Sequence, residues 1–380
     1  MNHDDLSAGF AGSALYEMVM ARDNGNWATA HDAARTLNAH PITAHPATAS
    51  LYRGAPAVAY VLHIAGHRAY ARALAELDAE VIAIVAYRLT AAERRMDRKQ
   101  PPLMREYDLI SGLTGLGAYL LHRGRAHALE RVLGYLVRLL TQTLTVDGYQ
   151  VPGWWAAAGQ RDQPESGAMA RGHVNFGIAH GVSGPLALLA LAHRAGCTVD
   201  GQHQAMAEVI EHLTTWAHPL KTRGNGWPEH LSLEAYEGGP VPGAAPGRPS
   251  WCYGTPGIGR ALQLAALALH DEAARRLAED TVLQAITDPR QLAHLTDTSL
   301  CHGWAGLLLT AHWIACDAST PAIRSGLPVL QSHLSARLEQ HEIPENAGLL
   351  TGPAGVLLAL HTLNPSRPVQ PGWETCLLLN

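Results

Sequence analysis

Two cysteines and one histidine form the most distinctive set of potential metal ligands in the sequence. Cys252 lies in the segment Arg248-Pro-Ser-Trp-Cys-Tyr-Gly254, and Cys301 is followed directly by His302. Two thiolates and an imidazole are good ligands for Zn²⁺, and three protein ligands leave one tetrahedral position open, as in catalytic zinc sites. The cysteines are too far apart in sequence for a zinc finger, so the fold must bring them together. The chain has 5 cysteines, and this odd number argues against a disulfide framework and leaves buried, inert thiols as the alternative for most of them.

Three further side chains could take part in chemistry beside such a metal. His180, in Ala179-His-Gly181, could be a fourth ligand, a general acid/base or a satisfied core histidine. A fourth protein ligand would close the zinc site, so we favour proton transfer, which suits a side chain that titrates near pH ~6.5. Asp108 could orient His180, and the guanidinium of Arg248 could stabilise a developing oxyanion. Taken alone, either type of residue is more often an ordinary ion-pair or capping residue.

Aromatic residues near these positions could contact a substrate. Trp251 and Tyr253 flank Cys252, and Trp154 and Trp155 stand together in a stretch rich in Pro and Gly. Packing in the core or in a loop is an equal alternative for Trp154 and Trp155.

A recurring Gly-x-x-Gly motif indicates how a fold could gather these residues. Clear copies begin at Gly112, Gly181, Gly254, Gly303 and Gly352, and Gly54-Ala-Pro-Ala57 is a weaker relative. Most copies precede a segment that is apolar on nearly all sides, which predicts a helix buried on both faces. Glycine at such a helix start permits a tight turn and close approach of neighbouring backbones. The residue before the first position of the motif is polar in every copy: Arg53, Ser111, His180, Tyr253, His302 and Thr351.

Amphipathic segments alternate with these apolar ones. Apolar residues recur at helical spacing over 129–140, 206–213 and 323–338, which predicts helices with one buried face. The alternation predicts an all-α fold, an α/α toroid (barrel) of inner and outer helices, in which parallel inner helices gather the polar motif residues at one end. We expect six helical hairpins, with a seventh in residues 13–38, where we find no motif. The repeats predict one domain over residues 1–380, with long loops at 150–175 and 222–250.

Composition narrows the classes of partner. The formal net charge is −5, 47% of residues are hydrophobic and 16% are charged, which suits a large buried core rather than a disordered chain. Lys and Arg are scattered, so nucleic acid is not an expected partner. The start of the sequence has no secretion-signal pattern, and no apolar run is long enough for a membrane span. We therefore expect a cytoplasmic protein.

At these residues the chain resembles the lanthionine synthetase C-like family, the cyclases of lanthipeptide biosynthesis. The resemblance runs from about residue 50 to the C-terminus and implies an α/α toroid with Zn²⁺ held by Cys252, Cys301 and His302 and water in the fourth position. It also implies that Asp108, His180, Arg248 and Tyr253 line the site. The matching segments are Tyr107-Asp-Leu-Ile-Ser-Gly-Leu-Thr-Gly115, Asn175-Phe-Gly-Ile-Ala-His-Gly181, Arg248-Pro-Ser-Trp-Cys-Tyr-Gly254, Leu300-Cys-His-Gly303 and Leu349-Leu-Thr-Gly-Pro-Ala-Gly355.

The implied activity is the closure of thioether rings in a ribosomally made peptide. A cysteine of a dehydrated precursor peptide would add to a dehydroalanine or dehydrobutyrine in the same peptide, and a separate dehydratase would act beforehand. One alternative is addition of glutathione to dehydroamino acids. A second is a non-catalytic peptide-binding toroid stabilised by zinc, against which the open fourth position argues. An α/α-barrel glycosidase would need paired carboxylates at the barrel mouth, and the motif positions do not supply them.

Overall fold

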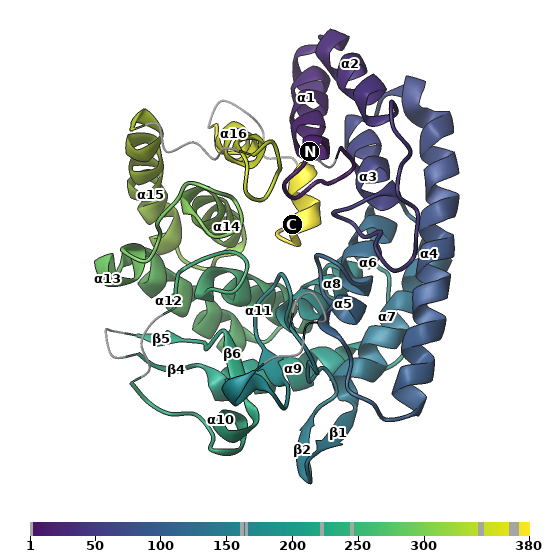
Figure 1. Cartoon of the computed structure of the whole chain (residues 1–380). Helices are drawn as coiled ribbons and strands as arrows, with labels where there is room; N and C mark the ends of the chain where they lie inside the picture. The colour runs from purple at the N-terminus through teal and green to yellow at the C-terminus, as the bar shows by residue number, and fades with distance from the viewer. Residues whose placement is uncertain are drawn as a thin grey trace.

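The computed structural model describes residues 3–159, 163, 166–220, 224–243, 247–340, 346–364 and 372–380. In this part of the chain, seven inner helices form a ring in which each contacts the next and the last contacts the first (Figure 1). In chain order they are α1 (Phe10–Asn24), α3 (Ala55–Ala65), α6 (Leu113–His122), α8 (Ser183–Arg194), α11 (Thr255–Leu269), α14 (Trp304–Asp317) and α16 (Pro353–Thr362).

Six longer or amphipathic helices pack on the outside of this ring. Each lies against the inner helix that precedes it in the chain. They are α2 (Ala28–Leu37), α4 (Ala71–Asp97), α7 (Ala126–Thr141), α9 (Gln202–Trp216), α12 (Glu272–Thr287) and α15 (Ala322–Glu339). In α7 the predicted apolar face, which includes Leu129, Leu133 and Leu136, is fully buried, whereas α8 is buried from Ser183 to Ala192 without interruption. The predicted α/α toroid, with inner and outer helices alternating along the chain, is confirmed.

The second glycine of the motif is required by close backbone packing. A Cβ on Gly257 would overlap the carbonyl oxygen of Trp251, and one on Gly306 would overlap that of Leu300. The same relation, to the carbonyl six residues earlier, holds at Gly115, Gly184 and Gly355. These five inner helices therefore start in close contact with the segment that leads into them, and a side chain at this position would push the two apart.

The seventh hairpin differs from its prediction. Helix α1 begins at Phe10, ahead of the expected 13–38, and it does carry the motif, as Gly9-Phe-Ala-Gly12. A Cβ on Gly12 would overlap backbone atoms of Gly348 and Leu349, so here the glycine serves the contact between the first and last inner helices. We missed this copy because Ala8, and not a polar residue, precedes it.

Backbone hydrogen bonds link successive entrances of the inner helices into a chain around one end of the toroid. In order, Leu109 N–H donates to Ala179 O (3.0 Å), Ala179 N–H to Cys252 O (3.2 Å), Cys252 N–H to Cys301 O (3.2 Å), Cys301 N–H to Leu350 O (2.8 Å) and Leu350 N–H to Ser7 O (2.9 Å). The segments before the inner helices thus lie side by side in register, and their side chains face one shared space. We call this end of the toroid the mouth.

The two predicted loops contain short strands and pair with each other, which corrects the expectation of irregular structure. Strand β3 (His173–Asn175) is antiparallel to β6 (His230–Ser232), with Val174 opposite Leu231. Two further antiparallel pairs are β1 (Thr143–Val146) with β2 (Tyr149–Pro152) and β4 (His218–Pro219) with β5 (Asn225–Gly226). The remaining short helices are η1 (Arg68–Tyr70), α5 (Met104–Tyr107), η2 (Gly167–Met169), α10 (Leu233–Glu237), α13 (Pro289–Leu292) and η3 (Trp373–Leu377). Residues 160–162, 164–165, 222–223 and 244–246 of these loops lie outside the described residues.

The last residues of the chain occupy the middle of the ring (Figure 1). Side chains from the inner wall bind the backbone carbonyls of this segment: Tyr60 Oη donates to Trp373 O (2.7 Å), Tyr52 Oη to Cys376 O (2.7 Å), Trp251 Nε1 to Leu377 O (3.1 Å) and Arg260 Nε to Leu379 O (2.8 Å). The axis of the toroid is therefore filled by protein, and the mouth does not open into a through-channel.

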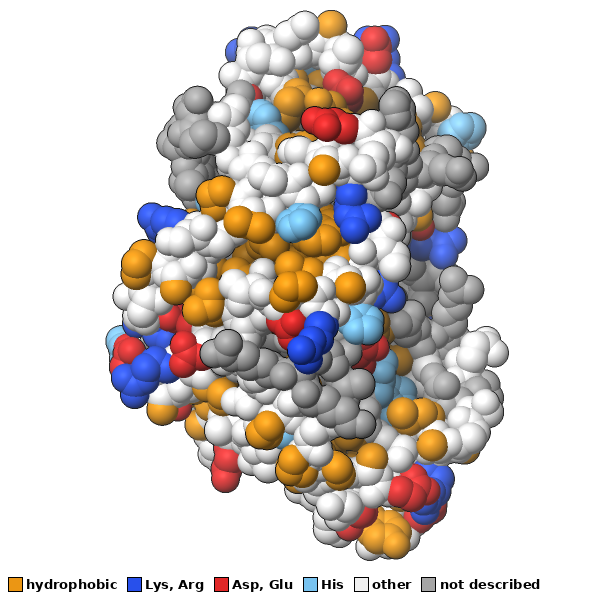
Figure 2. Space-filling model, turned by 90° about the vertical axis from the view of Figure 1, so that its left-hand side faces the viewer, with side chains coloured by type: hydrophobic (Ala, Val, Ile, Leu, Met, Phe, Trp, Pro, Cys, Tyr) orange, Lys and Arg blue, Asp and Glu red, His pale blue; other side chains and the backbone are white. Residues whose placement is uncertain are grey.

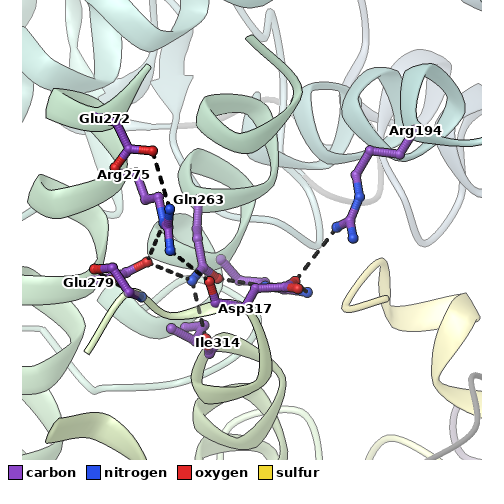
Figure 3. A network of polar contacts seen from close by, with 9 residues as sticks. Arg194, Gln263, Glu272, Arg275, Glu279, Ile314 and Asp317 are labelled. Carbon is purple, nitrogen blue, oxygen red and sulfur yellow. Dashed lines mark hydrogen bonds and ion pairs between the residues drawn. The ribbon is translucent and has the colours of Figure 1, made fainter. Parts of the chain in front are cut away.

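A polar network spans the ends of the inner helices opposite the mouth (Figure 3). Asp317, the last residue of α14, accepts from the buried Arg260 at 2.8 Å and lies 3.6 Å from Arg194, the last residue of α8. Gln263 donates to Glu279 Oε1 and to Ile314 O, both at 3.1 Å. Buried charges are tolerated only when they are paired and hydrogen-bonded. Since these bonds join residues of α8, α11, α12 and α14, the network holds the four helices in fixed relative positions.

Helix α16 has no outer helix packed on it within the described residues. Its Leu357 is 44% exposed, and Val329 of the neighbouring α15 is 57% exposed. Figure 2 shows apolar side chains gathering across the middle of the face that carries α15. None of the helices in the described parts of the chain combines the length and apolar character needed to cross a membrane.

Candidate metal and catalytic site

A cavity of about 900 Å³ lies at the mouth. The side chains predicted to gather there from the six motif copies all line it: Arg53, Ser111, His180, Tyr253, His302 and Thr351. The metal-ligand candidates Cys252 and Cys301 line the same cavity, as does Arg248. The toroid therefore places residues from the entrances of six inner helices around one space large enough for a peptide segment.

Cys252, Cys301 and His302 form a cluster of potential metal ligands. One ligand atom from each residue lies within 4.8 Å of the other two. The cluster forms because both cysteines stand at equivalent positions before inner helices, where the bond from Cys252 N–H to Cys301 O holds the two segments together. Among the described residues no other group of His, Cys, Asp and Glu meets this criterion.

The electrostatics of the cluster favour a thiolate. Hydrogen bonds from Cys301 and His302 hold the pKa of the Cys252 thiol well below its ordinary value, although burial opposes the shift. The hydrogen bond to Cys252 raises the pKa of His302. Cys252 Sγ also lies 3.6 Å from Ser250 Oγ. A divalent cation would take the place of the protons that now bridge these three groups, and two sulfurs with one imidazole are a donor set that fits Zn²⁺.

His302 has a carboxylate on its other side. Its Nε2 lies 3.4 Å from Asp297 Oδ2, and Asp297 Oδ1 accepts the Ser299 N–H at 2.7 Å. A carboxylate that binds the second ring nitrogen of a metal-binding histidine fixes its orientation and raises its basicity. This arrangement leaves Nδ1 of His302 as the nitrogen available to a metal. Sequence reasoning missed Asp297, whose only signal is its position in the loop that leads to Cys301.

His180 and Asp108 form a buried pair across the mouth. His180 Nδ1 lies 2.5 Å from Asp108 Oδ2, and the Asp108 side chain is fully buried. The other carboxylate oxygen accepts the Ser111 N–H at 2.6 Å, so both oxygens are engaged and the carboxylate has a fixed orientation. The ring of Tyr253 stacks on that of His180 with centroids 6.0 Å apart. Nε2 of His180 is consequently the ring nitrogen left to exchange a proton.

The cavity carries further charged groups that sequence reasoning did not assign to it. Arg88, Arg105 and Glu229 line it together with Arg248. Partial burial and the neighbouring Cys252 raise the pKa of the Glu229 carboxyl, and Arg248 opposes this shift. Glu229 precedes β6, which the pairing of β6 with β3 carries to the mouth. No motif marks this position in the sequence, so only the fold identifies it.

The three tryptophans proposed as substrate contacts are buried and do not line the cavity. Trp251 is 1% exposed and donates to Leu377 O, so it packs toward the filled axis. Trp155 is fully buried with its Nε1 bonded to Arg171 O at 3.0 Å. Trp154 is 4% exposed and packs edge-on against His212. These positions match the packing alternative stated for Trp154 and Trp155.

The architecture and the site define an α/α toroid with a Cys-Cys-His cluster at its mouth. Comparisons with known proteins show the family of this chain. A family model described as lanthionine synthetase C-like protein matches residues 1–378. The nisin biosynthesis protein NisC of Lactococcus lactis subsp. lactis is 25% identical over 336 residues, which cover 87% of this chain and 78% of NisC. The solved structure of nisin cyclase superposes with a TM-score of 0.79 at 21% identity, covering 100% of this chain and 92% of that one. The chain therefore belongs to the lanthionine synthetase C-like family.

Proposed function

We propose that this chain is a zinc-dependent lanthipeptide cyclase. It would add the thiol of a peptide cysteine to a dehydroalanine or dehydrobutyrine of the same peptide and so close a lanthionine or methyllanthionine ring. The observation that carries the proposal is that one cavity is lined both by the Cys252-Cys301-His302 cluster and by His180, which is paired with the buried Asp108. Membership of the family and the likeness to NisC support the choice of reaction.

Cys252, Cys301 and His302 would hold the metal. Bound there, Zn²⁺ would supply a thiolate at neutral pH, because metal coordination lowers the pKa of a thiol from its free value of about 8.5. Asp297 would orient His302 for this task, through the contact of 3.4 Å to Nε2. Two anionic sulfur ligands leave the cation little net positive charge, which favours a reactive sulfur nucleophile.

The addition forms a bond between sulfur and the β-carbon and moves the double-bond electron pair toward the carbonyl oxygen. Arg248, in the cavity wall, would stabilise the negative charge that develops on this oxygen. His180 would then deliver a proton from Nε2 to the α-carbon, with Asp108 holding Nδ1. Tyr253 would hold the His180 ring in place by stacking. The product is an isomer of the substrate, because the proton lost by the thiol is balanced by the one gained at carbon.

The reaction needs a substrate that already contains dehydroamino acids. We propose that a separate dehydratase supplies this dehydrated precursor peptide, and that the seven inner helices and their six outer helices act as one toroidal domain. A cavity of about 900 Å³ accommodates several residues of an extended peptide, which suits ring closure within one peptide.

A synthetic peptide with one dehydroalanine and one cysteine tests the proposal. The zinc-loaded protein should leave the peptide mass unchanged while its thiol becomes resistant to alkylation by iodoacetamide. His180→Ala should retain zinc and lower the rate by about 10²- to 10⁴-fold, and Cys316→Ala, whose exposed thiol lies at the opposite end of α14 from the cluster, should react as the wild type. With glutathione present, a peptide that gains the mass of glutathione in place of a ring would identify the alternative thiol donor. Unchanged rate and product stereochemistry for His180→Ala would rule out the role given to this residue.

A further inference from the structure

Arg88 reaches the mouth from an outer helix. It belongs to α4, and its guanidinium donates to three backbone carbonyls: Nε to Pro46 O (2.7 Å), Nη2 to Ala49 O (2.7 Å) and Nη1 to Ser111 O. The side chain stands in the wall between the mouth cavity and a smaller cavity of about 280 Å³, since it lines both. One side chain thus ties three segments of chain together directly beside the site.

The bond to Ser111 connects Arg88 with the His180-Asp108 pair. Ser111 offers its C=O to Arg88 and donates its N–H to Asp108 Oδ1. Asp108 Oδ2 in turn lies 2.5 Å from His180 Nδ1. The position of the Ser111 backbone therefore fixes the orientation of the Asp108 carboxylate, and that carboxylate fixes the imidazole.

The charge of Arg88 adds to this geometric link. Burial lowers the pKa of Arg88 to about 10, and the nearby Asp108 carboxylate opposes the shift, so the guanidinium stays charged at neutral pH. This partly buried positive charge attracts the Asp108 carboxylate. The other two carbonyls bound by Arg88 belong to the segment that contains Ala47 and Thr48, which line the mouth cavity.

We propose that Arg88 is a positioning residue that holds Asp108, through Ser111, in the orientation that selects the Nδ1-protonated form of His180. This proposal rests on the proposed function only where it predicts a change in the turnover of Arg88 variants. The state of the His180 ring can be measured without substrate, so failure of the cyclase proposal and failure of this one are distinguishable.

The direct test is the long-range ¹H-¹⁵N spectrum of the zinc-loaded protein labelled with ¹⁵N-histidine. The His180 signals are identified by their loss in His180→Asn. In the wild type they should report a proton on Nδ1, and in Arg88→Gln they should move toward a mixture of the two tautomers. Arg88→Lys keeps the charge but cannot bind all three carbonyls, so it should give an intermediate spectrum. It replaces Arg88→Gln in this test if that variant is too unstable to fold.

The matched control is Arg123→Gln. Arg123 is also a partly buried arginine that joins α4 to the end of α6, through Asp78 at 2.6 Å, but it follows the opposite end of α6 from Ser111. It should lose stability as Arg88→Gln does and leave the His180 signals unchanged. A folded Arg88→Gln or Arg88→Lys protein with the wild-type His180 spectrum would overturn the proposal, as would equal changes in Arg123→Gln.

Turnover of the same dehydroalanine-cysteine peptide gives a second measurement. Arg88→Gln should lower kcat by about 10- to 100-fold with a smaller change in KM, because peptide binding does not depend on the His180 tautomer. In the His180→Ala background the same substitution should leave kcat unchanged. Full additivity of the two effects would mean that Arg88 does not act through His180.

Discussion

The backbone N–H of Cys252 donates a hydrogen bond of 3.2 Å to the carbonyl oxygen of Cys301. This bond belongs to the series that joins neighbouring helix entrances, so the spacing of the two sulfurs is set by backbone packing in the toroid. The Cys252-Cys301-His302 cluster is therefore built on rigid structure, which suits a site that must keep its geometry while a substrate sulfur arrives.

Removing either cysteine should abolish metal binding and ring formation together. Cys252→Ala or Cys301→Ala leaves two donors, too few to compete with water for Zn²⁺. Zinc content measured by mass spectrometry should fall close to zero, and the peptide thiol should remain open to alkylation. Cys197→Ala provides the control, because Cys197 is not part of the cluster. A variant without zinc that still closes rings would contradict the proposed site.

Asp297 should tune zinc affinity without binding the metal. Asp297→Ala removes the carboxylate 3.4 Å from His302 Nε2, and loss of such a group lowers metal affinity by about 10- to 100-fold. Competition with a chromogenic chelator measures the change. Asp297→Asn retains an oxygen that can accept the Ser299 N–H. It therefore separates the effect of the lost charge on zinc affinity from the effect of losing this backbone hydrogen bond. Equal affinity in all three proteins would show that His302 needs no such support.

The glycines of the motif should matter for stability. Gly306→Ala places a methyl group against the carbonyl oxygen of Leu300, and overpacking of this kind costs about 1–3 kcal/mol. Gly134→Ala is the matched control in the outer helix α7, where nothing lies within 4 Å of the added Cβ, and should stabilise by about 0.4–1 kcal/mol. Urea denaturation gives both values. A neutral Gly306→Ala would mean that the helix entrance can yield without loss.

Two partly buried histidines at the end of the toroid opposite the mouth should make stability depend on pH. Burial lowers the pKa of both His63 and His122 to about 4, reinforced at His63 by Arg123 and at His122 by His63. Their unfolded-state value is about 6.5, so the unfolded chain binds more protons below that pH. The stability they contribute is complete above pH ~6.5 and is lost as pH falls toward 4.

The measurement is the urea midpoint at pH 7 and at pH 5. It should fall between these values in the wild type, and it should fall less in the double variant His63→Gln/His122→Gln. His212 and His230, whose pKa values burial also lowers to about 4, account for part of the remaining slope. An identical pH dependence in both proteins would show that these two histidines are not protonated differently on unfolding.

The sequence was sufficient for the toroid and for most of the mouth, because the motif marks each helix entrance. A polar residue directly before the glycine that starts an inner helix must lie at the mouth of the toroid. All six such residues line the cavity there. The motif copy of α1 escaped notice because Ala8, and not a polar residue, precedes it. Its glycine is explained by contact with Gly348 and Leu349, a relation between opposite ends of the chain that no local pattern records.

The supporting residues of the site could not be predicted in the same way. Arg88 lies on an outer helix whose periodic pattern indicates only which side is buried, and not which carbonyls it meets. Glu229 reaches the mouth because β6 pairs with β3, and two-residue or three-residue strands carry almost no sequence signal. The tryptophans illustrate the reverse error, since Trp251 is adjacent to Cys252 in sequence but points toward the axis and binds Leu377.

The filled axis has a consequence for the order of synthesis and folding. Tyr52 and Tyr60, in the second hairpin, bind residues more than 300 positions later in the chain, and α1 closes the ring only against α16. Loop-closure entropy makes such distant contacts slow to form. While the chain is still emerging from the ribosome, the segment that fills the axis is absent. The apolar side chains of the inner helices that face the axis are then exposed. A nascent chain of this kind exposes this apolar surface until residues 372–380 have been made, and such exposure favours binding by molecular chaperones.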